Sequence, residues 1–183
     1  MTKESNKILE AAVIGLKLLL ICAVIAGVVS CVYALTLDTY EKNLEATKSV
    51  AIGRIFGKEG LFCREMGEGS GVYTVEENGQ PIGYCVESLG KGFGGDIQLM
   101  VGYTADQKIV AVEIIGHSET PGVGDKVKNP DYLANYAGQG GELTLDADVD
   151  KIAGASVSSR GVIAGVNAAT KALQAFLAEG GAQ

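Results

Sequence analysis

The stretch GVYTVEENGQPIGYCVE at residues 71–87 decides the fold. Residues 71–76 and 82–87 are rich in β-branched and aromatic residues at a two-residue period, which is typical of strands with one buried face. Between them stands Asn78-Gly79, a dipeptide that favours the tight turn of a β-hairpin. These residues therefore predict two antiparallel strands joined by the segment 77–81.

The same pattern recurs further along the chain, after the glycine-rich run 90–95. Residues 96–103 and 109–115 form two more strand-like runs around the polar segment 104–108, which predicts a second hairpin. Together the two hairpins predict an antiparallel sheet of four strands or more, with β-branched residues on its buried face.

Helical patterns follow and complete an α+β class. Residues 161–178 carry an apolar stripe that predicts a helix packed on the sheet, and residues 129–136 predict a short helix. The segment 143–149 is expected to be a short strand, and 57–71 a loop or irregular edge. The stripe of the last helix consists of Val162, Val166, Ala169, Leu173 and the pair Phe176 and Leu177.

An apolar segment precedes the predicted sheet. Residues 18–37 are uncharged, and at about 1.5 Å per residue they reach roughly 30 Å, the thickness of a bilayer core. A cleaved signal peptide, or a lipoprotein site at Val28-Val29-Ser30-Cys31, is the alternative, but the length of the segment and Lys17 at its start argue against both. We expect a transmembrane helix whose helical character continues to about Ile55.

This anchor sets the expected domain organisation. Residues 1–17 would be a short cytoplasmic N-terminus, 18–37 the span through the lipid bilayer of the cell inner (cytoplasmic) membrane, and 38–183 one extracytoplasmic domain. Basic residues lie on both sides of the span, so the positive-inside rule does not decide its orientation. The orientation rests on the tendency of such single-pass anchors to export the domain on their C-terminal side.

The composition of residues 38–183 excludes one class of function. These 146 residues hold 12 Lys and Arg against 20 Asp and Glu, a net charge of −8. Because such a domain repels phosphate backbones, and because the chain has no Trp for base stacking, we expect no nucleic-acid binding.

Cysteine and histidine usage limits metal chemistry. Cys22 and Cys31 lie in the apolar span, while Cys63 and Cys85 lie in the soluble part, where they would form either a disulfide or two free thiols. With a single histidine, His117, the usual zinc patterns are missing, and we expect no metal site.

The stretch DKIAGASVSS at 150–159 is the main candidate for a binding site. It places hydroxyls at the start of the last helix, where free N–H groups and the helix dipole favour an anion. The alternative is a capping cluster of serines without a ligand. Two further glycine-bearing stretches, 92–95 and 117–124, together with this one suggest a flat or phosphorylated ligand.

These stretches resemble those of a known family, the G subunit of the Rnf electron-transport complex, and more distantly the C subunit of the sodium-pumping NADH:quinone oxidoreductase. The likeness lies in the N-terminal anchor, Gly-Phe-Gly-Gly at 92–95, His-Ser-Glu-Thr-Pro-Gly-Val-Gly at 117–124, and the 150–159 stretch. It implies an FMN-binding domain that carries FMN covalently through its phosphate.

The family motif assigns the acceptor. It runs from an Asp, through a small residue and Gly-Ala, to the acceptor hydroxyl, which here are Asp150, Ala153, Gly154-Ala155 and Ser156. The family usually has Thr as the acceptor and Ser or Thr as the small residue, so Ser156 and Ala153 depart from its pattern. A serine forms the same phosphoester, and Ser158 is the next candidate.

The resemblance also implies the surroundings of the cofactor. Thr120, Pro121 and Gly122 would pack against the flavin ring, and Glu119 would bond loop backbone or the ring edge. We expect His117 to be structural rather than a proton donor, and Phe93 to be a core residue rather than a stacking partner. The phosphate would lie among Gly154, Ala155, Val157, Ser158 and Ser159.

The implied function is that of a one-electron relay in an ion-translocating ferredoxin:NAD oxidoreductase, with no independent catalysis by this chain. The implied partners are the other Rnf subunits (A, B, C, D and E), notably the flavin-bearing D subunit and the membrane iron–sulfur site of A and E. A separate flavin transferase would attach FMN. The alternatives are a membrane-anchored structural or adhesive module without cofactor, and an anchored enzyme that uses FMN on a small substrate.

Overall fold

The predicted sheet is present and is larger than its two hairpins. The computed structural model describes residues 2–67 and 69–180, with side chains for 13–37 and from 43 onward, and within that range five strands form one antiparallel sheet. Each strand pairs with its neighbours in sequence, in the order β1-β2-β3-β4-β5. The strands are β1 (Phe62–Glu65), β2 (Val72–Glu77), β3 (Gln80–Lys91), β4 (Asp96–Tyr103) and β5 (Ile109–His117).

The first hairpin turns at the residues that predicted it. Asn78 and Gly79 have φ angles of 52° and 77°, the left-handed conformations that a two-residue hairpin loop requires. The turn is therefore shorter than the predicted segment 77–81, and β3 continues to Lys91. The edge strand β1 lies in the stretch expected to be a loop or irregular edge, because its four residues are mostly exposed and give no alternating pattern.

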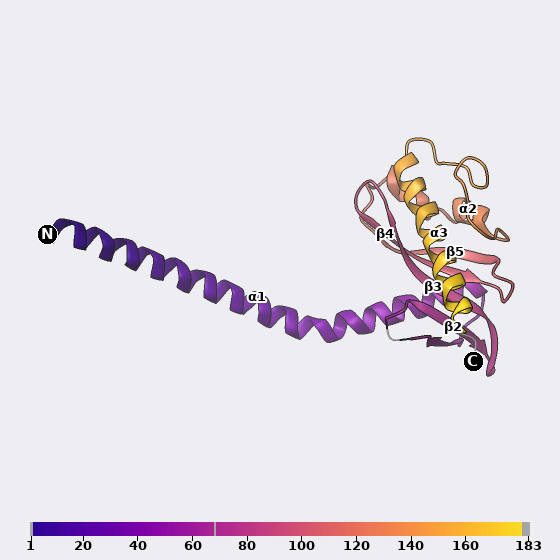
Figure 1. Cartoon of the computed structure of the whole chain (residues 1–183), viewed down its shortest axis with the longest axis horizontal. Helices are drawn as coiled ribbons and strands as arrows, with labels where there is room; N and C mark the ends of the chain where they lie inside the picture. The colour runs from indigo at the N-terminus through magenta and orange to yellow at the C-terminus, as the bar shows by residue number, and fades with distance from the viewer. Residues whose placement is uncertain (1, 68, 181–183) are drawn as a thin grey trace. The chain divides into compact units, whose positions relative to one another are not determined.

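Helices cover both faces of the sheet (Figure 1). Helix α3 (Ser156–Ala178) packs on one face, and the last turns of α1 (Thr2–Phe56) pack on the other. Strand β4 is buried on both sides because its side chains alternate: Leu99 and Tyr103 belong to the cluster under α3, whereas Met100 packs with the end of α1.

The predicted start of the last helix at Gly161 was wrong. The helix begins at Ser156, and Ala155 occupies the N-cap position without any side-chain cap bond. Serines are frequent caps, so their cluster suggested that the helix had not yet begun. In the structure Ser158 and Ser159 are fully helical. Their hydroxyls do not cap the helix, because that of Ser158 donates to Glu119 and that of Ser159 accepts from the Ile152 N–H.

Short helices connect β5 to α3. The predicted helix at 129–136 is present as α2 (Pro130–Leu133) followed by η2 (Ala134–Tyr136), with η1 (Gly124–Lys128) before them. Asn129 caps α2 by accepting from the Asp131 N–H at 3.0 Å.

The strand expected at 143–149 was wrong. In the described chain this segment makes only an isolated bridge between Leu145 and Val149. Its backbone is satisfied by side chains instead: the Asn167 amide bonds both the N–H and the C=O of Leu143 at 2.8 Å. A sheet partner is therefore not required there.

The cysteines of the soluble part are free thiols. Cys63 lies in β1 and Cys85 in β3, and both are unpaired. Strand β2 runs between them, so their Cα atoms are at least about 10 Å apart, beyond the roughly 7 Å that a disulfide spans. Burial raises the pKa of the Cys85 thiol, which keeps it neutral and unreactive.

The chain divides into two units, residues 1–45 and 46–183. In the first, Val13–Leu37 is a 25-residue stretch of helix with exposed apolar side chains, long enough to cross a membrane. Among the described residues α3 is also apolar enough, but almost half of it is buried against the sheet, as expected of a core helix. The predicted span 18–37 lies inside the first stretch, and its insertion and orientation stay predictions.

Candidate functional site

The three glycine-bearing stretches meet at one cavity of about 380 Å³. This volume falls in the usual range for small-molecule sites. A larger hollow of about 610 Å³ beside the end of α1 contains none of the predicted site residues. The smaller cavity is lined by Phe93, Glu119, Thr120, Val123, Gly124, Gly154, Ala155, Ser156, Val157 and Ser158.

The first turn of α3 supplies free backbone donors to this cavity. Gly154 has φ +81°, which turns the chain into the helix, and Ser156 is the first helical residue. The first intrahelical bond runs from the Ser159 N–H to the Ala155 carbonyl at 2.9 Å. The N–H groups of residues 156–158 therefore have no helical acceptor, which suits an anion.

The serines of this turn differ in exposure and bonding. Ser156 is partly buried, lines the cavity, and has no side-chain hydrogen bond to any described residue. Ser158 is 1% exposed, and its Oγ donates to the Glu119 Oε2 at 2.5 Å. Ser159 is fully buried, and its Oγ accepts from the Ile152 N–H at 3.1 Å. Of these three hydroxyls, that of Ser156 alone is uncommitted.

Glu119 joins the three stretches. It is 5% exposed, and its Oε1 accepts from the Gly94 N–H at 3.0 Å while its Oε2 accepts from Ser158. A Cβ at Gly92 or Gly124 would overlap its carboxylate oxygens, so the glycines at these two positions leave the space that the carboxylate occupies. The carboxylate thus bonds loop backbone, the first of the two roles expected for it.

The remaining loop residues divide between the cavity and the surface. Thr120 lines the cavity, and its carbonyl accepts from the N–H groups of Val123 and Gly124 at 3.2 and 3.1 Å. Pro121 and Gly122 are exposed and lie outside the lining. Sequence reasoning missed Val123 and Gly124 as lining residues, although both stand in the 117–124 stretch that pointed to the site.

The expectation that Phe93 is a core residue was wrong. Its side chain is 78% exposed and lines the cavity. Val123 and Val157 are 48% and 43% exposed at the same cavity. Because glycines flank Phe93, no neighbouring side chains cover it, and the three residues form an apolar rim suited to a flat ring.

His117 has a structural environment. It ends β5, lies outside the cavity lining, and its Nδ1 accepts from the Glu119 N–H at 3.2 Å. This bond shapes the turn that delivers Glu119. In the part of the chain that the structure describes, no group of His, Cys, Asp or Glu could hold a metal ion.

A family model matches the region that builds this cavity. Residues 92–171 match the FMN-binding domain, and all of the lining residues fall inside that range. The region that builds the cavity is therefore similar to FMN-binding domains.

Two curated proteins show the same relationship over a longer stretch. The chain is 29% identical over 111 residues to the G subunit of the proton-translocating ferredoxin:NAD(+) oxidoreductase complex of Clostridium ljungdahlii, covering 57% of this chain and 60% of that protein. It is 31% identical over 123 residues to the G subunit of the ion-translocating oxidoreductase complex of Vibrio atlanticus, covering 58% and 59%. The chain thus spans about three fifths of the length of these relatives.

A solved structure shares the fold. The C subunit of the sodium-translocating NADH-quinone reductase of Parabacteroides distasonis superposes with a TM-score of 0.50 at 22% identity, covering 58% of this chain and 61% of that one. The α+β architecture with a covered antiparallel sheet is therefore common to both.

The residues present fit FMN. Free N–H groups and an uncommitted hydroxyl suit its phosphate, and the rim of Phe93, Val123 and Val157 suits its ring. The residues that line the cavity include no Lys, Arg, His or Cys.

Proposed function

We propose that this chain, which matches the FMN-binding domain at residues 92–171, is the electron-relay subunit of an ion-translocating ferredoxin:NAD oxidoreductase complex of the Rnf type. The likeness to the G subunits of two such complexes supports this assignment. The observation that supports the proposal most directly is the cavity at the start of α3. It is lined by Ser156, whose hydroxyl is uncommitted, and the backbone N–H groups of the same turn are free.

We further propose that FMN is bound covalently through a phosphoester to Ser156. In that reaction a bond forms between the Ser156 Oγ and the FMN phosphorus of FAD, the pyrophosphate bond breaks, AMP leaves, and the hydroxyl proton passes to solvent. A separate flavin transferase would catalyse it, since the Glu119 carboxylate of the cavity already accepts from the Gly94 N–H and from Ser158.

When bound, FMN supplies one-electron chemistry that no side chain of this cavity can perform. The chain supplies position and environment. The N–H groups of residues 156–158 hold the phosphate, and the rim of Phe93, Val123 and Val157 keeps water from the ring. Glu119 fixes the loops around both.

The proposed setting follows from the anchor. The apolar stretch Val13–Leu37 would hold the subunit in the cell inner membrane, with residues 46–183 outside the cytoplasm. There the domain would exchange electrons with the flavin of the D subunit and with the iron–sulfur site of the A and E subunits.

Covalent attachment is tested with the full chain coexpressed with a flavin transferase. We expect yellow fluorescence that stays with the acid-denatured polypeptide, and a tryptic peptide 152–160 heavier by one FMN less one water. Ser156→Ala should abolish both signals, whereas the matched variant Ser156→Thr, which keeps the hydroxyl, should retain them. A colourless wild-type chain would favour the structural or adhesive module instead.

A further inference from the structure

Ser156 and Ser158, on the first turn of α3, border the same cavity, but only the hydroxyl of Ser158 is hydrogen-bonded to another side chain. We infer that Glu119 is the positioning residue that directs FMN to Ser156 by withholding the hydroxyl of Ser158. This inference rests on the proposed function, because it concerns which hydroxyl is esterified.

The first reason is the hydrogen bond itself. A hydroxyl has one proton, and that of Ser158 is donated to the Glu119 Oε2 at 2.5 Å. To react, Ser158 would have to give up this bond and leave a carboxylate oxygen unsatisfied at a site that is 5% exposed. Such an unpaired buried acceptor is costly. Ser156 reacts without losing any side-chain bond.

The second reason is charge. A phosphodiester carries one negative charge, and on Ser158 that charge would lie against the Glu119 carboxylate. Two like charges at this separation oppose each other strongly where little water screens them. On Ser156 the phosphate would instead face the open cavity and the free N–H groups of the helix.

The third reason is that a second hydrogen bond keeps the Glu119 carboxylate beside Ser158. Its Oε1 is held by the Gly94 N–H at 3.0 Å. The carboxylate also fills the space that two glycines leave open, since a Cβ at Gly92 or Gly124 would overlap its oxygens. The carboxylate therefore stays in contact with Ser158 as the flavin is attached.

The test is the position of the flavin, read by fragmentation of the tryptic peptide 152–160 from the full chain coexpressed with its transferase. Wild type should carry FMN on Ser156 alone, and Ser156→Ala should be bare. The double variant Ser156→Ala/Glu119→Gln should carry FMN on Ser158, about tenfold or more above the single variant. Adding Ser158→Ala should remove that signal. The double variant Ser156→Ala/Glu119→Ala provides a second route to the same result.

The same exchange at Glu113, a β5 residue outside the cavity lining, is the matched control. The double variant Ser156→Ala/Glu113→Gln should leave Ser158 as bare as Ser156→Ala alone. Loading of Ser158 in Ser156→Ala alone would overturn the inference, as would bare Ser158 in both Glu119 double variants. Loading of Ser158 in the Glu113 control would also overturn it, since removal of a carboxylate outside the cavity would then suffice. A bare wild-type chain would instead refute the proposed function.

Discussion

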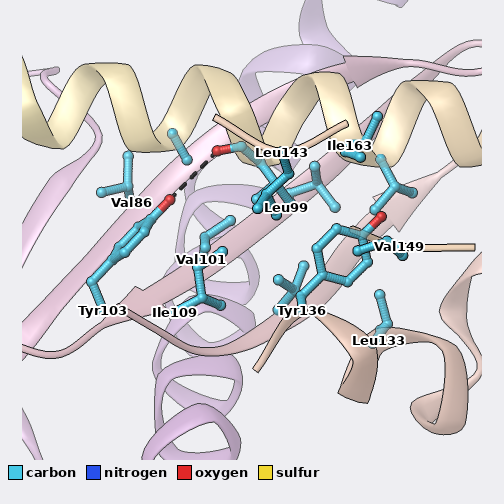
Figure 2. Close-up of a cluster of buried hydrophobic side chains, with 14 of the residues drawn as sticks. Val86, Leu99, Val101, Tyr103, Ile109, Leu133, Tyr136, Leu143, Val149 and Ile163 are labelled. Atoms are coloured by element: carbon cyan, nitrogen blue, oxygen red, sulfur yellow. Dashed lines mark hydrogen bonds between the residues drawn. The ribbon is translucent and has the colours of Figure 1, made fainter. Parts of the chain in front are cut away.

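Tyr103 is among the largest side chains that are fully buried between the sheet and α3. Its hydroxyl lies 3.0 Å from the Thr170 Oγ1, and the dashed line in Figure 2 marks this bond. The ring packs among aliphatic side chains of the same cluster, including Val86 and Val101. A polar group is thus taken into the core only because helix α3 supplies a partner for it.

Removing that hydroxyl should destabilise the domain. Tyr103→Phe keeps the ring but leaves Thr170 without this partner, so we expect the free energy of unfolding to fall by about 1 kcal/mol. Urea denaturation of residues 46–183 followed by circular dichroism measures the change. Tyr84→Phe is the matched control, because the partly buried Tyr84 hydroxyl bonds no described residue, and an equal loss there would contradict the role of the bond.

Tyr103 should also make the domain less stable as the pH rises into the alkaline range. Burial raises the pKa of Tyr103 from 10.0 to about 12, so the folded state keeps a proton that the unfolded chain releases. This contribution to stability is complete below pH 10 and is lost as the pH rises through 12, amounting to about 3 kcal/mol. Between pH 9 and 12 the free energy of unfolding should fall less steeply with pH in Tyr103→Phe than in the wild type. Identical slopes in the two proteins would refute this role of Tyr103.

At this scale the sequence predicted part of the site. Ser156, Glu119 and Thr120 were recognisable because they stand in short motifs near helix and strand ends. The bond between Glu119 and Ser158 was not, since it joins residues 39 positions apart and no local pattern encodes it. Phe93 was misread because an aromatic residue in a glycine run looks apolar and buried, whereas its exposure depends on which neighbours lack side chains.

Among the elements, β3 and α3 approach unusually closely. A Cβ at Gly90 would overlap the Gly161 carbonyl, and one at Gly161 would lie 2.6 Å from the Lys91 carbonyl oxygen. A Cβ at Gly165 would overlap a methyl group of Leu99. Because these glycines have no side chains, the backbones of β3 and α3 can approach closely, and the start of α3 packs against the end of β3.

Methyl groups at this contact should separate the two elements. We expect Gly161→Ala to lower the free energy of unfolding by about 1–3 kcal/mol through overpacking, despite the better helix propensity of alanine. It should also reduce flavin loading, since Ser156 lies in the turn just before it. Gly140→Ala is the control, because its Cβ would meet atoms only at 3.8 and 4.0 Å. The melting temperatures of Gly161→Ala and Gly140→Ala measure this difference. Equal stability of the two variants would contradict the close packing of β3 and α3.

The elements themselves were predicted where local chemistry determines them. Asn78-Gly79 located one hairpin, and the two-residue period located β4 and β5 almost to the residue. The start of α3 and the segment 143–149 were misjudged because tertiary partners decide them. The Ser158 and Ser159 hydroxyls are bonded from outside the first turn, and Asn167 replaces a strand partner for Leu143.

On the scale of the whole molecule, the second unit includes the last turns of α1. Ala51, Ile52 and Ile55 are nearly fully buried against Val75, Cys85 and Met100 of the sheet. The end of the long helix is therefore part of the domain core rather than a linker. Residues 46–183 contain both hydrophobic clusters in full.

A fragment of residues 46–183 should fold alone in detergent-free buffer with one cooperative melt. A fragment of residues 57–183 lacks Ile52 and Ile55, whose burial contributes about 3–6 kcal/mol, a large share of the stability of a typical domain. We expect it to be largely unfolded. Circular dichroism and heteronuclear NMR of the two fragments measure this, and a well-dispersed spectrum for 57–183 would show that the helix end is dispensable.

The meander of the sheet has a consequence for the timing of maturation. Each strand pairs with its neighbours in sequence, so β1 to β5 can assemble in the order of synthesis. Helix α3 follows the five strands in sequence, and the cluster beneath it is not covered until the residues of α3 have been synthesised. Ser156, the proposed acceptor, therefore reaches its place beside the sheet only after all five strands have been synthesised, and a polypeptide that ends within α3 would carry no flavin.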